Sequence, residues 1–176
     1  MSAAGAPARR GWRALLASFG HAWDGVVETA AHQRNMRIHL AAGMAVSALA
    51  SAVPLALASD LALLFCIFLV LSAEVANSAL EALVDLVTRE RHELARRAKD
   101  AGAGAVLVLA SGSVAVLAAV AAHDWRALAR ASRSGVRPGW LAVLLALGAV
   151  SLAAARRRRR ARPVEGLGDL TRKSDP

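Results

Sequence analysis

Four polar side chains interrupt the apolar stretch LVLSAEVANSALEALVDLV (69–87): Glu74, Asn77, Glu81 and Asp85. A helix turns by about 100° per residue, so these side chains and Ser78 lie in one stripe about a third of the helix circumference wide. The rest of this helix surface is Leu, Val and Ala. Because an ionised group inside a bilayer has a high free-energy cost, the stripe must face a protein interior, a partner or a cation.

Carboxylates in this arrangement can do two kinds of chemistry. Three of them on one face, within three helical turns, form a hard-oxygen site of the kind that Mg²⁺ accepts. A carboxylate held at low dielectric beside other acids also accepts a proton more readily. The alternative is a polar seam that only binds helices together, as a single Asn or Ser would indicate. Three acids on one face favour a functional site.

The segment after the acidic stripe is highly charged and has the sequence RERHELARRAKDAGAGA (89–105). Lys99 is the one lysine before the C-terminal tail, and it lies beside Asp100. A lysine next to carboxylates and a metal suits a polyphosphate. On its own it fits equally well a membrane-edge lysine that extends to water.

The usual nucleotide-binding motifs are missing from the sequence. No P-loop, Rossmann or protein-kinase signature occurs, and the small residues AGAGA (101–105) open an apolar span, which fits helix packing better than a phosphate loop. Glu90, His92 and Glu93 are polar loop residues that could contact a nucleotide, but each is a weak signal. Any nucleotide chemistry therefore requires an unconventional site.

The remaining pattern predicts an all-α integral membrane helical bundle. Hydrophobic residues make up 56% of the 176 residues and charged residues 20%, and the two kinds are segregated along the chain. Apolar residues at three- and four-residue steps from Trp12 to Ala30 predict an interfacial amphipathic helix, rather than one packed on a soluble core. Three transmembrane helices and a short fourth apolar helix are expected at 38–58, 61–87, 101–122 and 139–155.

Arginine placement predicts the orientation of the spans. Arginines precede the first span and occupy the connector between the second and third, whereas the connector between the first and second has neither Lys nor Arg. By the positive-inside rule, the N-terminus and the charged connector face the cytoplasm. A fourth span, which we favour, leaves four arginines outside against this rule: Arg126, Arg130, Arg133 and Arg137. An interfacial helix, or a segment that only dips into the membrane, would explain them otherwise.

The chain divides into four predicted regions. These are a disordered N-terminus (1–11), a membrane domain (12–122), an extra apolar segment with an arginine-rich flank (123–162) and a disordered tail (163–176). Pro54 is expected to kink or end the first span. The run Arg156–Arg162 also admits a nucleic-acid interpretation, but beside an apolar segment we favour a membrane anchor and expect no nucleic-acid partner. Cys66 is the only cysteine, which excludes an intrachain disulfide.

Two stretches of this sequence closely resemble the prokaryotic diacylglycerol kinase family, which includes the undecaprenol kinases. They are EVANSALEALVD (74–85) and HELARRAKDAGAGAV (92–106), and SFGHAWDGVVET (18–29) and RNMRIH (34–39) also match. The resemblance covers about 12–122. It implies a homotrimer of small subunits, each with an interfacial helix and three spans, which uses MgATP to phosphorylate a membrane lipid alcohol.

The resemblance also implies residue roles. Glu74 becomes the catalytic base on the lipid hydroxyl, and Glu81 coordinates the Mg²⁺ that bridges the ATP phosphates. The positions implied to support the metal and bind ATP are Asn77, Asp85, Glu90, Arg91, His92, Lys99 and Asp100. Phosphoryl transfer needs mainly positioning and charge neutralisation, which such a cluster supplies.

One position departs from the family pattern. Where the family usually has a second metal-ligating glutamate, this chain has Gln33. An amide oxygen binds Mg²⁺ without charge, so the metal would be held more weakly unless a neighbouring acid such as Glu28 compensates. We therefore expect a membrane lipid kinase acting on diacylglycerol or undecaprenol. The alternatives are a non-catalytic membrane scaffold of the same family, and a small cation or proton transporter, which would carry acids on more than one span.

Overall fold

The structure, a computed structural model, describes residues 7–88, 90–128 and 136–161. This part of the chain is helical and contains no strand. The helices are α1 (Pro7–His32), α2 (Arg34–Ala52), α3 (Leu57–Val87), α4 (Glu93–His123), α5 (Trp125–Leu128) and α6 (Pro138–Ala161). The predicted all-α membrane bundle is confirmed.

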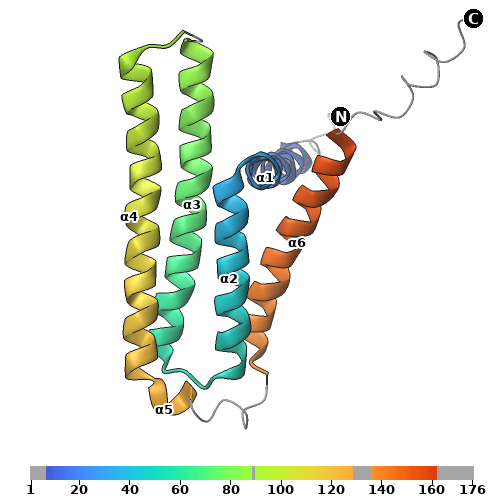
Figure 1. The fold of residues 1–176 in the computed structure, drawn as a ribbon. Helices are drawn as coiled ribbons and strands as arrows, with labels where there is room; N and C mark the ends of the chain where they lie inside the picture. Colours follow the sequence, from blue (N-terminus) through green and yellow to red (C-terminus); the bar gives the residue numbers. More distant parts are fainter. Residues whose placement is uncertain (1–6, 89, 129–135, 162–176) are drawn as a thin grey trace, which may run out of the picture.

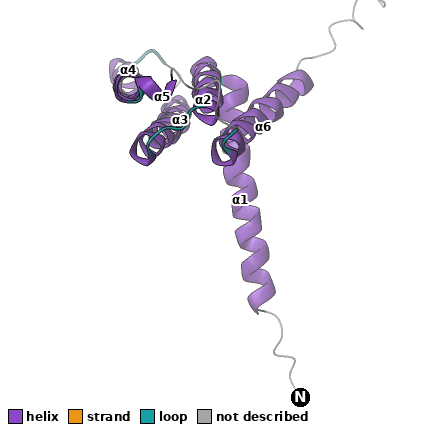
Figure 2. Cartoon of the chain, turned by 90° about the horizontal axis from the view of Figure 1, so that it is seen from below, coloured by secondary structure: helices purple, strands orange, loops and turns teal. Residues whose placement is uncertain are grey.

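The long helices stand side by side, and α1 lies across them (Figure 1). Helices α3 and α4 form an antiparallel hairpin that extends beyond α2, and α6 lies on the other side of α2. Seen along the bundle, α1 projects sideways from the end of α2 (Figure 2). The order of packing across the bundle is therefore α4, α3, α2 and α6, with α1 at the end where α2 begins.

Helix α2 is central to the packing and buries Met36, Leu40 and Ser47. Close approach of its neighbours depends on Gly43. A Cβ atom at that position would lie 3.2 Å from Cδ1 of Leu147 on α6 and 3.3 Å from Cγ2 of Ile67 on α3. These distances are tighter than ordinary van der Waals contact, so glycine lets both helices pack directly on α2.

Among the described residues, three helices are long and apolar enough to cross a membrane: α3, α4 and α6. Helix α2 is not one of them, although a first span was expected at 38–58. Its 19 residues extend about 28 Å at ~1.5 Å per residue. Conversely, the expected short fourth helix at 139–155 is longer than predicted and continues through Arg160.

The sequence signals set the helix boundaries, with shifts of a few residues. Helix α2 ends at Ala52 because Pro54 disfavours the helical conformation at Val53, whose backbone is extended. Helix α3 consequently begins at Leu57, four residues before the predicted span. Helix α1 begins at Pro7, a favourable first helical residue, and so includes residues 7–11 of the predicted N-terminal region. Residues 1–6 and the predicted disordered tail 163–176 lie outside the described residues.

Helix α1 has the two faces expected of an interfacial helix. Val27, Ala30 and Ala31 are buried against the bundle. Its exposed large apolar side chains are Trp12, Leu15, Leu16, Phe19 and Trp23. Exposed tryptophan and phenylalanine on a helix that lies across the spans suit the boundary between lipid and water.

Helix α6 is joined to the rest of the fold at its first turn. Asp60 on α3 accepts hydrogen bonds from both terminal nitrogens of Arg137 and from Nε1 of Trp140, the last at 2.8 Å. The guanidinium also donates to the carbonyl of Val53 at 3.1 Å. Hydrogen bonding to Asp60 raises the pKa of Arg137, so the arginine stays charged. This ion pair explains one of the arginines that stood against the positive-inside rule.

The other end of α6 meets α1. Nε of Arg157 lies 2.6 Å from Oε2 of Glu28, and NH1 lies 3.6 Å from Oδ1 of Asp24. Arginines at the end of α6 thus lie at the same end of the bundle as the α3–α4 connector and the start of α2 (Figure 1). Arg130 and Arg133 lie outside the described residues.

Replacing Asp60 by asparagine should loosen the attachment of α6. Arg137 would keep its charge but lose its partner in a partly buried position, which costs about 1–3 kcal/mol. We expect a lower thermal unfolding midpoint in detergent micelles and a changed Trp140 fluorescence. Glu93→Gln is the matched control, because it removes an acid that pairs with Arg96 and Arg97 on an exposed surface. Equal midpoints for the two variants would contradict the anchoring role of Asp60.

Gly102 is the second position where a close approach requires glycine. A Cβ atom there would overlap with Oδ1 of Asn77 and lie 2.8 Å from Cδ2 of Leu80. Gly102→Ala should therefore separate α4 from α3 and cost about 1–3 kcal/mol, measured by thermal or denaturant unfolding. Gly104→Ala on the same helix is the control, because nothing lies within 4 Å of its added Cβ. If Gly102→Ala and Gly104→Ala changed the free energy of unfolding by the same amount, this packing would be contradicted.

Candidate active site

Glu74 is the deepest acid of the predicted stripe and is only 2% exposed. Its Oε1 lies 3.3 Å from Nε2 of His39 on α2, and the histidine side chain is 22% exposed. The two atoms are within ion-pair distance but are not aligned as a hydrogen bond. A buried acid thus has a histidine from the neighbouring helix as its polar contact, and we call this the His39–Glu74 pair.

Glu81 lies two turns further along α3 and meets two amides. Nε2 of Gln33 donates to Oε2 of Glu81 at 3.1 Å, and Nδ2 of Asn77 donates to Oε1 at 3.0 Å. Gln33 joins α1 to α2, so the connection between these helices is held against α3. The structure therefore brings together the three residues that the sequence associated with a metal, in what we call the Gln33–Glu81 cluster.

The pair and the cluster lie along the same interface between α2 and α3. Glu74 and Glu81 are seven residues apart, which corresponds to about 10 Å along the helix axis. Between them, Oγ of Ser78 and Oδ1 of Asn77 are buried without a hydrogen-bond partner in the described part of the chain. Unpaired buried oxygens are costly, and Oδ1 of Asn77 packs closely against Gly102 of α4.

The Gln33–Glu81 cluster fits a hard cation such as Mg²⁺. Glu81 supplies a carboxylate, and both amides present an oxygen if their side chains rotate. Oδ1 of Asn77 is buried against Gly102 of α4 without a hydrogen-bond partner, so this amide must rotate to turn its oxygen toward Glu81. Within the described residues no group of three His, Cys, Asp or Glu side chains could hold a metal. A cation here would therefore depend on the amides of Gln33 and Asn77.

Glu28 does not compensate for the missing charge at position 33. Its carboxylate contacts Nε of Arg157 at 2.6 Å and Nδ1 of His32 at 3.1 Å. The acid is therefore directed to α6 rather than to Glu81. The expected compensating role of Glu28 is therefore not supported. Its partner Arg157 lies on α6, outside the predicted membrane domain (12–122), so the pairing could not be foreseen from that domain.

A polar pocket lies beyond the cluster, at the tip of the α3–α4 hairpin. Its volume is about 430 Å³, and Thr88 lines it together with charged residues from both helices. Nζ of Lys99 lies 2.5 Å from Oδ1 of Asp85 within this pocket. Five residues implied to bind the nucleotide line it: Asp85, Glu90, Arg91, His92 and Lys99.

Two of the predicted nucleotide positions have other contacts. Asp100 does not line the pocket, and its Oδ2 accepts a hydrogen bond from NH1 of Arg96 at 2.6 Å. His92 caps α4, because its Nδ1 accepts a hydrogen bond from the backbone N–H of Leu94 at 3.2 Å. Lys99 and Asp100 are neighbours in sequence but face different partners, so the structure does not bring them together around one ligand.

The sequence patterns did not single out His39, although the motif RNMRIH (34–39) ends at this residue. A lone histidine in an apolar helix carries no signal by itself. The signal would have been its spacing from Gln33, since the two are six positions apart and meet acids that are seven positions apart. Two antiparallel helices can place both histidine and glutamine opposite the same acidic stripe.

Known proteins match the part of the chain that carries this site. Residues 20–121 match the model of the family described as prokaryotic diacylglycerol kinase. A diacylglycerol kinase of Synechocystis sp. is 50% identical over 105 residues, which cover 58% of this chain and 59% of that protein. An undecaprenol kinase of Bacillus subtilis is 43% identical over 93 residues, covering 53% of this chain and 76% of that protein. A diacylglycerol kinase of Escherichia coli is 34% identical over 103 residues, covering 56% and 80%.

No solved structure matches the chain. The Synechocystis match spans less than two thirds of that protein, and the family-model match ends before α6. It does include Gln33, the whole acidic stripe of α3 and the hairpin tip. Because the family model covers more than half of this sequence, the resemblance seen in its motifs is confirmed: the chain belongs to the prokaryotic diacylglycerol kinase family, a family of lipid kinases.

Proposed function

We propose that the protein transfers the γ-phosphate of MgATP to the hydroxyl group of a membrane lipid alcohol, at the cytoplasmic surface of the bacterial inner membrane. One observation carries this proposal. Glu74 is buried on the same face of α3 as Glu81, between an apolar bundle on one side and a charged hairpin tip on the other. A lipid would approach from the apolar side and ATP from the charged side.

The charged pocket at the hairpin tip suits the nucleotide. Lys99 can exchange its contact with Asp85 for a phosphate, because an ammonium group is a compact charge with three donors. Arg91 and His92 from the same pocket add further donors. The pocket is open to solvent and polar, as a triphosphate that enters from water requires.

Glu81, Asn77 and Gln33 would hold the Mg²⁺ ion. The ion would neutralise charge on the phosphates when bound. Because only Glu81 contributes a charge, the protein should need more Mg²⁺ than a relative with two carboxylates at these positions. We thus propose a kinase that holds its Mg²⁺ ion weakly. The alternative is a family member that has lost activity and acts as a membrane scaffold.

The orientation follows from charge. The arginines at the start of α2, in the α3–α4 connector and at the end of α6 lie at one end of the bundle, which we assign to the cytoplasm by the positive-inside rule. The homotrimer implied by the family resemblance stays a prediction. It is compatible with the largely apolar exposed surface of α4, where only Val106 and Val120 are buried within one chain.

A lipid phosphorylation assay tests the function. Purified protein in detergent would receive labelled MgATP with either diacylglycerol or undecaprenol, since relatives carry both names. We expect one of the two lipids to be phosphorylated, and Glu74→Gln to lower the rate by about 10²–10⁴-fold, as for loss of proton acceptance.

Asp24→Asn is the matched control, because it also neutralises an acid but on the exposed surface of α1. Its rate should stay near that of the parent. Absence of product from both lipids, in folded protein, would reject the kinase and leave the scaffold. Equal rates for Glu74→Gln and the parent would reject the role of Glu74.

Gln33→Glu should make the protein more dependent on Mg²⁺ for stability. A second carboxylate opposite Glu81 adds like-charge repulsion without metal and a charged ligand with it. We expect a lower unfolding midpoint in chelator and a larger rise on Mg²⁺ titration than in the parent. The double variant Gln33→Glu with Glu81→Gln keeps the parent's number of charges and should lose this gain. A single variant whose Mg²⁺ response equals that of the parent would contradict a metal at this cluster.

A further inference from the structure

Helix α6 forms one wall of an apolar groove with a volume of about 500 Å³. The other walls come from three helices, with Trp23 on α1, Leu40 on α2, and Phe68 and Val75 on α3. Helix α6 leans away from α2 toward its C-terminal end, where α1 crosses the bundle (Figure 1). Because the family-model match ends at residue 121, the groove depends on a helix outside that match.

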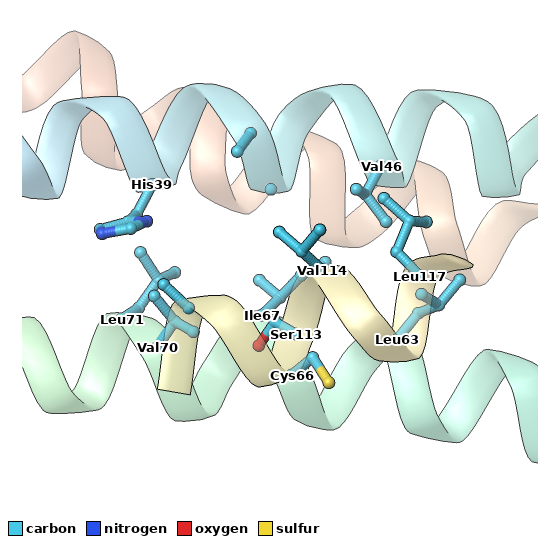
Figure 3. A pocket seen from close by; sticks show the side chains of 13 residues that line it. His39, Val46, Leu63, Cys66, Ile67, Val70, Leu71, Ser113, Val114 and Leu117 are labelled. Carbon is cyan, nitrogen blue, oxygen red and sulfur yellow. The ribbon is translucent and has the colours of Figure 1, made fainter. Parts of the chain in front are cut away.

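The groove is distinct from the cavity beside the candidate active site. That cavity has a volume of about 190 Å³ and lies between α2, α3 and α4. Figure 3 shows His39 projecting into it from α2, toward Val70 and Leu71 of α3. Among the described residues, Leu71 is the one that lines both spaces. The groove therefore lies on another side of α3 from the His39–Glu74 pair.

The open side of the groove is suited to a hydrocarbon chain. Phe68 on α3 and Ala149 on α6 are exposed, and both belong to helices long and apolar enough to cross a membrane. Exposed apolar side chains of such helices face the hydrocarbon of the bilayer. An apolar space with few polar partners does not hold water, so a lipid chain is the natural occupant.

The groove face of α6 continues into arginine at the end of the helix. At about 100° per residue, Ala146, Ala149 and Ala153 lie on one side of α6, and Arg156 and Arg160 extend this side toward the C-terminal end. Ala149 and Arg156 are seven residues apart, about 10 Å along the axis. A lipid with its chain in the groove would therefore place its head group near these two arginines.

The arginines differ in their partners. All five residues of the run Arg156–Arg160 are exposed. Arg157 is occupied by two acids of α1, with Nε at 2.6 Å from Oε2 of Glu28 and NH1 at 3.6 Å from Oδ1 of Asp24. Within the described residues, the other four arginines have no ion-pair partner. Arg156 and Arg160 thus remain available to an anion above the groove, where a guanidinium binds phosphate oxygens well.

We propose that the groove and these two arginines form a binding site for an anionic phospholipid of the bilayer. One acyl chain lies in the groove, and the phosphodiester meets Arg156 and Arg160. An uncharged lipid alcohol would not use the arginines, and ATP would not use the apolar groove. The bound lipid contacts α1, α3 and α6 together, so it holds the extra helix to the rest of the fold. This inference goes beyond the proposed kinase function and does not depend on it.

A comparison of two phospholipids tests the head-group contact. The full chain in a nonionic detergent would receive dioleoyl phosphatidylglycerol or dioleoyl phosphatidylcholine, which share their acyl chains and differ in net charge. We expect phosphatidylglycerol to raise the thermal unfolding midpoint by about 4–8 °C more than phosphatidylcholine. This is the size expected when two arginines gain an anionic neighbour in a chain of this length.

Two double variants with equal charge separate a site from general attraction. Arg156→Gln with Arg160→Gln should remove most of the difference between the two lipids. Arg158→Gln with Arg159→Gln is the matched control, because it removes the same charge from the same helix end, on sides that turn away from the groove. The control should keep at least half of the difference. Arg157 is retained in both variants because it pairs with Glu28.

Native mass spectrometry tests the groove. We expect at least one phosphatidylglycerol per chain to stay bound after release from detergent. Ala149→Phe fills the groove from an exposed position and should lower the bound fraction at least threefold. Ala142→Phe is the control, because this exposed alanine lies on the same side of α6, two turns earlier and outside the groove lining. Its bound fraction should equal that of the parent.

The outcomes that overturn the site are distinct. Equal losses in the two arginine variants would show general attraction of the helix end to negative charge. Equal midpoints with the two lipids would reject head-group recognition, and unchanged binding in Ala149→Phe would reject the groove. Protein without bound phosphatidylglycerol, in which Ala149→Phe changes the number of associated chains, would place a second copy in the groove instead. No readout uses lipid phosphorylation, so an inactive protein would reject the proposed kinase and leave this site untouched.

Discussion

Pairing of acids within an apolar helix bundle is the constraint on which the rest of this structure depends. An unpaired charge between apolar helices costs several kcal/mol, so each acid needs a donor. Three acids of α3 contact polar groups from other parts of the chain: Glu74 lies within ion-pair distance of His39, and Glu81 and Asp60 accept hydrogen bonds from Gln33 and Arg137. These contacts fix the register of α2 and α6 against α3, because a slide of one residue would separate every pair.

The same constraint places chemically different groups at different depths on one helix. Glu74 lies among buried side chains and contacts a histidine, whereas Glu81 is half-buried and contacts amides. Asp85 is exposed and contacts an ammonium group. Moving along α3 toward the hairpin tip, the surroundings change from suitable for a proton transfer in an apolar cavity to suitable for phosphates in water. A reaction that joins a lipid to a nucleotide requires such a gradient.

Helical phase alone was sufficient to predict the acidic stripe, because it depends only on residues of one helix. Pro54 similarly predicted where α2 ends. The partners of the acids could not be predicted in this way, since they come from other helices whose register depends on packing around Gly43. His39 therefore carried no recognisable signal, and Glu28 appeared free to reach the metal site although Arg157 holds it.

Helix α6 shows how a segment outside the family match becomes part of the same network. Arg137 fixes its first turn to Asp60, and Arg157 fixes its last turns to Glu28, one turn before Gln33. Helix α6 is therefore held to α3 at one end and to α1 at the other. This attachment restrains the position of α1, and with it the position of Gln33, which joins α1 to α2. Gln33 contributes no charge to the cluster, so its amide is useful to a cation only if its backbone is held in place. Attachment of α6 supplies that restraint, which links the extra helix to the geometry of the site without any contact between them.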